Sequence, residues 1–132
     1  GVQYRPADEL VLEDTTYTFP QVEADPRLDV DYPWVSETYT LNGKRHTIVQ
    51  LNHLDNPKET KFSAYRDYGR FGAFFVSPIE DGATLTINYR FLIGEGELNS
   101  IAQVQANWDE FVGSSKLSDI PPITISGGGR KL

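Results

Sequence analysis

The sequence predicts a mainly β fold: an antiparallel β-sandwich-like domain of about six to eight strands with one C-terminal α-helix near residues 100–112. Two observations predict the sheets. Alternating, β-branched runs flank Asn42 and Gly43, and a further alternating run follows Gly82. The helix is predicted because apolar residues recur at helical spacing after Ser100.

The first strand is predicted over residues 10–19, where apolar side chains lie on both sides of a break near Glu13 and Asp14. Pro20 is expected to end this strand, because proline cannot donate to a strand ladder. Residues 22–33 combine two prolines with several acids, which is typical of a loop. The aspartates of this acidic loop are Asp25, Asp29 and Asp31.

The clearest local signal is a β-hairpin centred on Asn42 and Gly43. The Asn-Gly dipeptide readily supplies the positive φ angles that a two-residue hairpin turn requires. The runs on either side, residues 37–41 and 46–51, are rich in β-branched side chains and alternate in polarity. The sequence therefore predicts two adjacent antiparallel strands at this point.

A further strand is predicted over residues 85–91, after a turn that ends at Gly82. Alternate positions of this run are apolar, which indicates a strand with one buried and one wetter face. Gly94 and Gly96 are expected to end the strand. The residues expected on its buried face are Leu85, Ile87, Tyr89 and Phe91.

The predicted helix spans residues 101–112. Ser100 stands at the N-cap position, and Gln103 follows at the capping-box spacing, which satisfies two backbone N–H groups. Gly113 is expected just after the helix, at C′. The stripe expected to face a sheet consists of Ile101, Val104, Trp108 and Phe111. A short last strand is predicted over residues 123–125.

A chain of 132 residues is long enough to form one domain with its own core. We expect a single β-rich domain over residues 1–125 and a flexible, glycine-rich tail over residues 126–132. The chain contains no methionine and begins with glycine, so we interpret it as an excised piece of a longer protein. A short protein trimmed at its N-terminus is the alternative.

The chain is acidic, with a formal charge of −7. Binding to nucleic acid needs a basic face, and so does binding to an anionic membrane surface. No apolar run approaches the roughly 20 residues that span a bilayer. We therefore expect neither nucleic acid nor a membrane as a partner. Cysteine is absent, so disulfides give no indication of the compartment.

Residues 62–75 concentrate aromatic and charged side chains. Six of the sixteen aromatic residues (two Trp, seven Tyr and seven Phe) stand in these fourteen positions, together with two arginines and an aspartate. Gly69 and Gly72 are expected to let the backbone turn or approach another group closely. This combination of rings, charges and glycines singles out the segment as the most informative part of the chain.

Two interpretations of residues 62–75 stay open. The rings could fill a β-sandwich core, with Arg66 and Asp67 as a structural ion pair. Alternatively, some rings face a groove and stack on a flat apolar ligand face, such as that of a pyranose. In that case Arg66, Asp67 and Arg70 would hydrogen-bond to hydroxyl groups or a carboxylate, because arginine offers a planar fork of donors.

Residues 34–112 resemble the C-terminal part of an uncharacterised bacterial family, the PmoA-like ("methane oxygenase PmoA") family. The family pattern is His-Pro-x-Asn-Pro followed by an Arg-x-Tyr-Gly block. In the first block His53, Asn56 and Pro57 match, and Leu54 replaces the proline. In the second block Arg66, Tyr68 and Gly69 match.

The resemblance implies export, with a secreted or periplasmic location, and an association with carbohydrate processing. The N-terminal half of the family domain carries a histidine-rich stretch that has no counterpart in this chain. If the chain is part of a larger two-sheet domain, an apolar sheet edge is expected to drive self-association or pairing with the missing N-terminal half.

Metal binding is not expected, and no cofactor is identified. His46 and His53 stand at the two ends of one predicted strand, on opposite faces and about 23 Å apart at the usual strand rise. They cannot share a metal ion unless the strand breaks. Calcium at the acidic loop is the less favoured alternative to a solvated loop, because the spacing of its acids matches no calcium-binding motif.

Catalytic motifs are sparse. No cysteine and no Gly-x-Ser-x-Gly elbow supports nucleophilic catalysis. A carboxylate pair for glycoside cleavage could be formed by Asp67 with Glu95 or Glu97, but spacing in the sequence does not fix their separation in space. Whether the protein is an enzyme is therefore left open.

The leading hypothesis is a carbohydrate-associated binding domain, or the partial site of an exported carbohydrate-active protein. Its expected ligand-binding residues are Asn56, Tyr65, Arg66, Tyr68 and Arg70. The first alternative is a carbohydrate-active enzyme, oxidative or of the lyase or hydrolase type. Its catalytic residues would be His53 and Asp67. The second alternative is a structural or assembly domain without a ligand, in which the aromatic segment is core.

Overall fold

The computed structural model describes residues 1–66, 69–98 and 100–114. In chain order its elements are β1 (Val2–Tyr4), β2 (Val11–Thr18), β3 (Trp34–Leu41), β4 (Lys44–Asn52), β5 (Lys61–Phe62), β6 (Phe71–Phe74), β7 (Tyr89–Glu95) and α1 (Ile101–Ser114). The strand predicted over residues 123–125 and the tail predicted over residues 126–132 lie outside the described residues.

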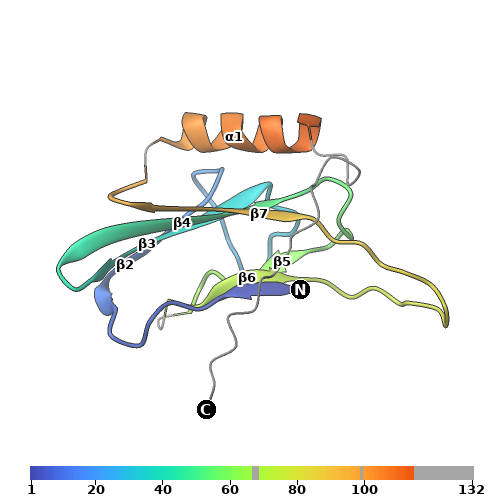
Figure 1. Cartoon of the computed structure of the whole chain (residues 1–132), viewed down its shortest axis with the longest axis horizontal. Helices are drawn as coiled ribbons and strands as arrows, with labels where there is room; N and C mark the ends of the chain where they lie inside the picture. Colours follow the sequence, from blue (N-terminus) through green and yellow to red (C-terminus); the bar gives the residue numbers. More distant parts are fainter. Residues whose placement is uncertain (67–68, 99, 115–132) are drawn as a thin grey trace, which may run out of the picture.

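The strands form two antiparallel sheets. One sheet has four strands in the order β2-β3-β4-β7, and the other has three strands in the order β1-β6-β5. Figure 1 shows three layers, with α1 on one face of the four-stranded sheet and the three-stranded sheet on the other. The predicted fold class, an antiparallel β-sandwich-like domain with a C-terminal helix, is confirmed.

The central strands of the four-stranded sheet, β3 and β4, are buried on both faces, because they carry apolar side chains at odd and even positions. The face toward the three-stranded sheet contributes Val35, Tyr39 and Ile48 to a core that also holds Phe62 and Phe71. Burying one such side chain stabilises the fold by roughly 1.5–3 kcal/mol. The opposite face packs against α1 through Trp34, Val49, Leu51, Val104 and Phe111.

Polar contacts also cross the space between the two sheets. The hydroxyl groups of Tyr4 and Tyr39 lie 2.7 Å apart and hydrogen-bond to each other. The Gln50 Nε2 donates to the backbone carbonyl of Val2 at 3.4 Å. Both contacts tie β1 to the central strands of the four-stranded sheet, so β1 is anchored by more than its pairing with β6.

The predicted hairpin is confirmed. Strands β3 and β4 pair in register from Trp34↔Leu51 to Leu41↔Lys44. Asn42 and Gly43 form the turn with φ angles of +52° and +73°. Two positive φ angles belong to a type I′ turn, whose twist matches that of the flanking strands.

The predicted break in the first strand is a bulge in β2. The pairing of β2 with β3 shifts register between Val11 and Thr16, a span that contains Glu13 and Asp14. Arg45 of β4 donates to the backbone carbonyl of Asp14 at 2.6 Å. The bulge is thus held by a side chain from an inner strand of the sheet.

The strand predicted over residues 85–91 is shifted toward the C-terminus. Strand β7 begins at Tyr89, which pairs with Asn52, the last residue of β4. Leu85 precedes the pairing and is 36% exposed, so its expected place on the buried face is wrong. Gly94 does not end the strand, because it pairs with Thr47. The start of β7 therefore coincides with the end of its partner strand β4, which a local sequence pattern does not reveal.

The helix is confirmed, with three local differences. Ser100 caps it, since its Oγ accepts from the Gln103 N–H at 3.1 Å, while the Gln103 side chain donates to Asn107 instead of completing a capping box. Helix α1 continues through Gly113 to Ser114. Ile101 is exposed, so the buried stripe begins at Val104. Among the described residues no helix is long and apolar enough to cross a membrane.

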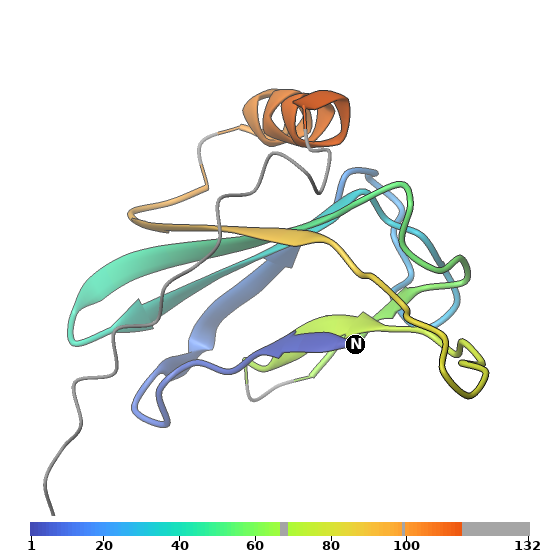
Figure 2. The same cartoon turned by 45° about the vertical axis from the view of Figure 1, so that its right-hand side comes forward.

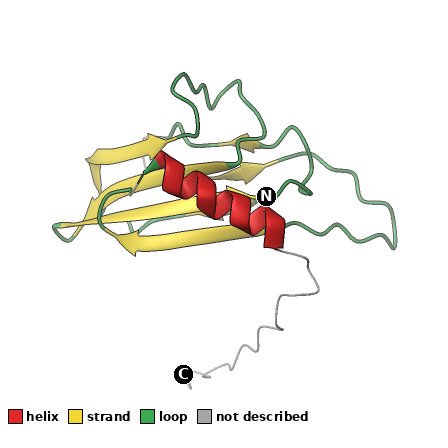
Figure 3. Cartoon of the chain, turned by 90° about the horizontal axis from the view of Figure 1, so that it is seen from above, coloured by secondary structure: helices red, strands yellow, loops and turns green. Residues whose placement is uncertain are grey.

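Residues 75–88 form a long arm between β6 and β7. The arm projects beyond the sandwich in the views of Figures 1 and 3, and Figure 2 shows it from a third direction. Val76 and Ile79 on this arm are largely exposed. Near its tip, the Ala83 N–H donates to the Glu80 carbonyl at 3.0 Å, which closes a turn.

Candidate functional site

Strands β5 and β6 divide the aromatic segment between core and surface. In their pairing Phe62 stands opposite Ala73, and both are buried, whereas Lys61 stands opposite Phe74 on the outer face. Phe74 is 43% exposed and Tyr65 is 38% exposed. The segment is therefore neither all core nor all groove, because strand alternation sends neighbouring side chains to opposite faces.

The exposed rings border a surface hollow of about 480 Å³, which we call the Tyr65 hollow. This volume falls within the usual range of roughly 300–1,000 Å³ for ligand sites. Its walls come from the outer face of β5 and β6, from the turn after β5 and from the acidic loop. The lining residues are Pro26, Arg27, Lys61, Phe62, Ser63, Tyr65, Arg66 and Phe74.

Cationic side chains surround the Tyr65 ring. The Arg27 guanidinium lies over the ring at 4.3 Å from its centroid, and the Arg66 guanidinium lies at 5.5 Å. Such cation–π contacts attract each guanidinium to the ring face. Lys61 Nζ donates to the Arg27 carbonyl at 3.4 Å, and Tyr17 OH donates to the Arg66 carbonyl at 3.0 Å. These contacts fix the backbone that presents both arginines.

Two further hollows continue this surface toward Arg70. One, of about 440 Å³, shares Tyr65 and Arg66 with the Tyr65 hollow and is lined on its other side by β2. The next, of about 320 Å³, is lined by Arg70 and by residues 5–8, and it shares Leu12 with its neighbour. The structure thus brings Tyr65 and Arg66 together and places Arg70 on the same surface.

His53 lies elsewhere, at the end of β4 on the helix side of the four-stranded sheet. Its side chain is buried, and its ring meets Phe111 edge-on with the centroids 5.1 Å apart. Its Nδ1 accepts from the Asp55 N–H at 3.1 Å, while Nε2 has no hydrogen-bond partner in the described part of the chain. His53 lines none of the three hollows around Tyr65 and Arg70.

Asn56 is buried in a hydrogen-bond network that joins two loops. Its Nδ2 donates to Asn52 Oδ1 and to the Asn88 carbonyl, both at 2.7 Å. Its Oδ1 accepts from the Asn88 N–H at 2.7 Å. The Asn56 side chain thereby fixes the base of the arm at the start of β7.

We expect Asn56→Ala to lower the free energy of unfolding by about 2–3 kcal/mol, because it removes three hydrogen bonds and takes away the partners of Asn52 Oδ1 and the Asn88 N–H. Urea denaturation followed by tryptophan fluorescence measures this change. Gln21→Ala serves as the control, since it removes one exposed hydrogen bond, and its cost should stay within about 0.5 kcal/mol. Equal, small effects of both changes would contradict the structural role of Asn56.

Asp67 and Tyr68 lie outside the described residues, so the roles proposed for them stay predictions. Glu95 and Glu97, considered with Asp67 as a carboxylate pair, contact cations on the four-stranded sheet. Glu97 accepts from Arg45 at 2.6 Å, which lowers the pKa of Glu97, and Glu95 lies 3.5 Å from Lys44 Nζ.

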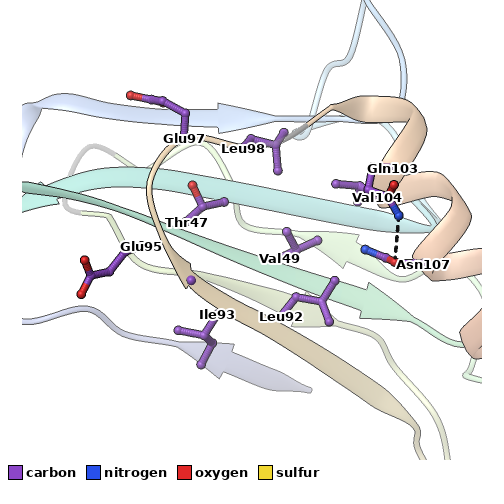
Figure 4. A pocket seen from close by; sticks show the side chains of 11 residues that line it. Thr47, Val49, Leu92, Ile93, Glu95, Glu97, Leu98, Gln103, Val104 and Asn107 are labelled. Carbon is purple, nitrogen blue, oxygen red and sulfur yellow. Dashed lines mark hydrogen bonds between the residues drawn. The ribbon is translucent and has the colours of Figure 1, made fainter.

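Glu97 and Glu95 also border a separate cleft of about 240 Å³ between β7 and α1. Figure 4 shows apolar side chains along this cleft and the hydrogen bond between Gln103 and Asn107 at its helical end. The charged groups that line it are both acidic. The cleft therefore differs in charge from the Tyr65 hollow.

His46 and His53 face opposite sides of the four-stranded sheet, since His46 stacks on Tyr39 in the inter-sheet layer. Across the described ranges, no three His, Asp or Glu residues are grouped as a metal site would need. In the acidic loop, Asp29 accepts from Tyr32 OH, which lowers the pKa of Asp29. Asp31 accepts from the backbone N–H groups of residues 59 and 60.

Glu37 is a buried carboxyl group that sequence reasoning missed. It lies on the inner face of β3, its exposed fraction is 0%, and neither oxygen has a hydrogen-bond partner among the described residues. Burial raises its pKa to about 8, so the group is mostly protonated at neutral pH. Gly69, with φ +68°, passes so close that a Cβ there would lie 2.8 Å from Glu37 Oε1 and from Leu10 Cδ2.

The sequence patterns also did not single out three residues that line the Tyr65 hollow. Arg27 stands in a loop predicted from its acids, and Lys61 stands just before the aromatic segment. Phe74 belongs to that segment but was not separated from the rings expected in the core. A strand pattern over residues 61–64 and 71–74 would have placed Lys61 and Phe74 on the outer face, whereas the approach of Arg27 depends on tertiary folding.

Residues 1–109 of the chain match the model of a family of unknown function, DUF6807. The chain belongs to this family. The matched residues include every strand of the described part of the chain and most of α1, so the DUF6807 domain contains the Tyr65 hollow. Comparison with curated proteins gives no match, and comparison with solved structures gives none. The resemblance of this DUF6807 member to the PmoA-like family stays a prediction.

Proposed function

We propose that this chain is a carbohydrate-associated binding domain that takes a saccharide in the Tyr65 hollow. The observation that carries the proposal is the combination of two exposed rings, Tyr65 and Phe74, with cationic donors around one concave surface. Saccharides present flat apolar faces and a rim of hydroxyl groups, so they suit a site with rings and a few placed donors.

Each side of the hollow has a distinct role in the proposed complex. Phe74 offers an exposed ring against which a pyranose stacks. Arg27 and Arg66 offer N–H donors to hydroxyl groups, and their positions are set by the Tyr65 ring. Arg70 lies farther along the same surface and would contact the next residue of an oligosaccharide.

A catalytic role for His53 has less support. Its imidazole is buried beneath α1 and does not line the proposed site. A general base must come within hydrogen-bond distance of the substrate proton it removes. Export, and pairing with a second copy or with a further segment, stay predictions that rest on the resemblance and on the sequence.

The test is titration of the full chain with a panel of mono- and oligosaccharides, followed by NMR and calorimetry. We expect binding of one saccharide class and a loss of about ten-fold or more in affinity for Phe74→Ala and Tyr65→Ala, which corresponds to about 1.4 kcal/mol. Ile79→Ala, which truncates an exposed apolar side chain on the arm, should bind as the unchanged chain does.

Two outcomes would overturn the proposal. One is the absence of any chemical-shift change or heat signal across the panel. The other is binding that survives both Phe74→Ala and Tyr65→Ala while these variants remain folded, because the ligand would then lie elsewhere.

A further inference from the structure

We infer that the saccharide bound in the Tyr65 hollow carries a negative charge, as a uronic acid or a sulfated sugar does. This inference rests on the proposed function and adds the class of ligand. The hollow is lined by Arg27, Lys61 and Arg66, and none of the described residues that line it is acidic. Three cations on one concave surface stand out in a chain with a net charge of −7.

Arg27 and Lys61 lack an acidic partner. Across residues 1–66, 69–98 and 100–114, neither side chain forms an ion pair. Some cations elsewhere among the described residues do form such pairs, among them Lys44 with Glu95 and Arg45 with Glu97. The difference leaves positive charge at the hollow for a ligand.

The neighbouring acidic loop does not supply the missing partner. Asp25 Oδ1 accepts from the backbone N–H of Arg27, not from its guanidinium. Asp29 accepts from Gln21, from Tyr32 and from the Asp25 N–H. Asp31 accepts from the backbone N–H groups of residues 59 and 60. The hydrogen bonds of these three aspartates therefore go to backbone N–H groups and to uncharged side chains, and none goes to the Arg27 guanidinium or to Lys61 Nζ.

The geometry of Arg27 suits an anionic group. A guanidinium that lies over a ring uses its face for the ring and keeps its N–H donors in the plane. Those donors match the two oxygens of a carboxylate or sulfate. Lys61 stands opposite Phe74 in the strand register, so both side chains leave the same face of the sheet, and Lys61 Nζ lies 3.4 Å from the Arg27 carbonyl.

The experiment compares trigalacturonic acid, its methyl ester, a sulfated galacto-oligosaccharide and inorganic phosphate on the full chain by calorimetry. We expect an anionic saccharide to bind at least about ten-fold more tightly than the neutral ester, and added sodium chloride to weaken its binding selectively. The relative affinities of the uronate and the sulfated sugar identify the anionic group.

Two variants locate the effect. Lys61→Gln should reduce the preference for the anionic sugar by about five-fold or more, because it removes a positive charge beside the ligand. Lys58→Gln is the control, since Lys58 is an exposed lysine that contacts the Leu54 carbonyl and does not line the hollow. Equal losses in both variants would show a general charge effect and overturn the inference.

The outcomes separate the two proposals. If neither trigalacturonic acid nor the sulfated galacto-oligosaccharide binds more tightly than the neutral methyl ester, the inferred charge is overturned and saccharide binding is left standing. No binding of any sugar, or full competition by inorganic phosphate at the same concentration, overturns the proposed function together with the inference.

Discussion

The free energy of unfolding is expected to fall by roughly 3–4 kcal/mol as the pH rises from about 5 to 8, and Glu37→Gln is expected to remove this fall. The cause is the buried carboxyl group of Glu37, whose pKa rises to about 8. The folded protein keeps a proton that the unfolded chain releases above its ordinary carboxyl pKa of about 4.3. Stability is therefore fully present below that pKa and is lost as the pH approaches the folded value.

Urea denaturation at a series of pH values measures the effect. Among the described residues, the two other carboxyl groups with shifted pKa values are those of Asp29 and Glu97. Both pKa values are lowered, so their contributions change below the pH window of Glu37. Glu9→Gln, at an exposed position, should keep the pH dependence of the unchanged chain. A flat profile of the unchanged chain, or parallel profiles for the unchanged chain and Glu37→Gln, would contradict the prediction.

Gly72→Ala is expected to destabilise the protein by more than about 3 kcal/mol, because strand β1 loses its place beside β6. A Cβ at Gly72 would lie 2.4 Å from the Val2 carbonyl oxygen and 2.6 Å from Gln3 Cα. Both atoms belong to the backbone of β1, which cannot move aside while its pairing is kept. The Tyr4–Tyr39 hydrogen bond would be lost together with the pairing.

Gly94→Ala is the matched control for Gly72→Ala. Gly94 also stands in a strand, but a Cβ there would meet nothing within 4 Å, and we expect a change within about 1 kcal/mol. Denaturation measures the cost, and hydrogen exchange at residues 2–4 reports the release of β1. Similar stabilities of the two variants, or retained protection of β1 in Gly72→Ala, would contradict this account.

Features governed by neighbouring residues could be predicted from the sequence. The Asn42-Gly43 turn and the Ser100 cap depend on a few adjacent positions, and both stand as expected. The bulge in the span that contains Glu13 and Asp14 is also local, because it interrupts an otherwise alternating run. Such features can be predicted because the residues that form them fix the local backbone angles directly.

Features governed by distant residues could not be predicted. Strand β7 starts at Tyr89 because β4 ends at its partner Asn52, and no local pattern contains that information. Strands β1 and β5 have only three and two residues, too few for periodicity to reveal. Arg27 reaches Tyr65 across 38 positions of sequence, so the chemistry of the hollow emerges only in the folded chain.

The projecting arm over residues 75–88 offers a route to site-selective labelling. The chain has no cysteine, so Ala83→Cys would introduce its sole thiol, at an exposed position near the tip of the arm. A fluorophore attached there would stand clear of both sheets, as Figure 3 shows for the arm itself. Coupled to a sensor surface through the same thiol, every molecule would be immobilised in one orientation.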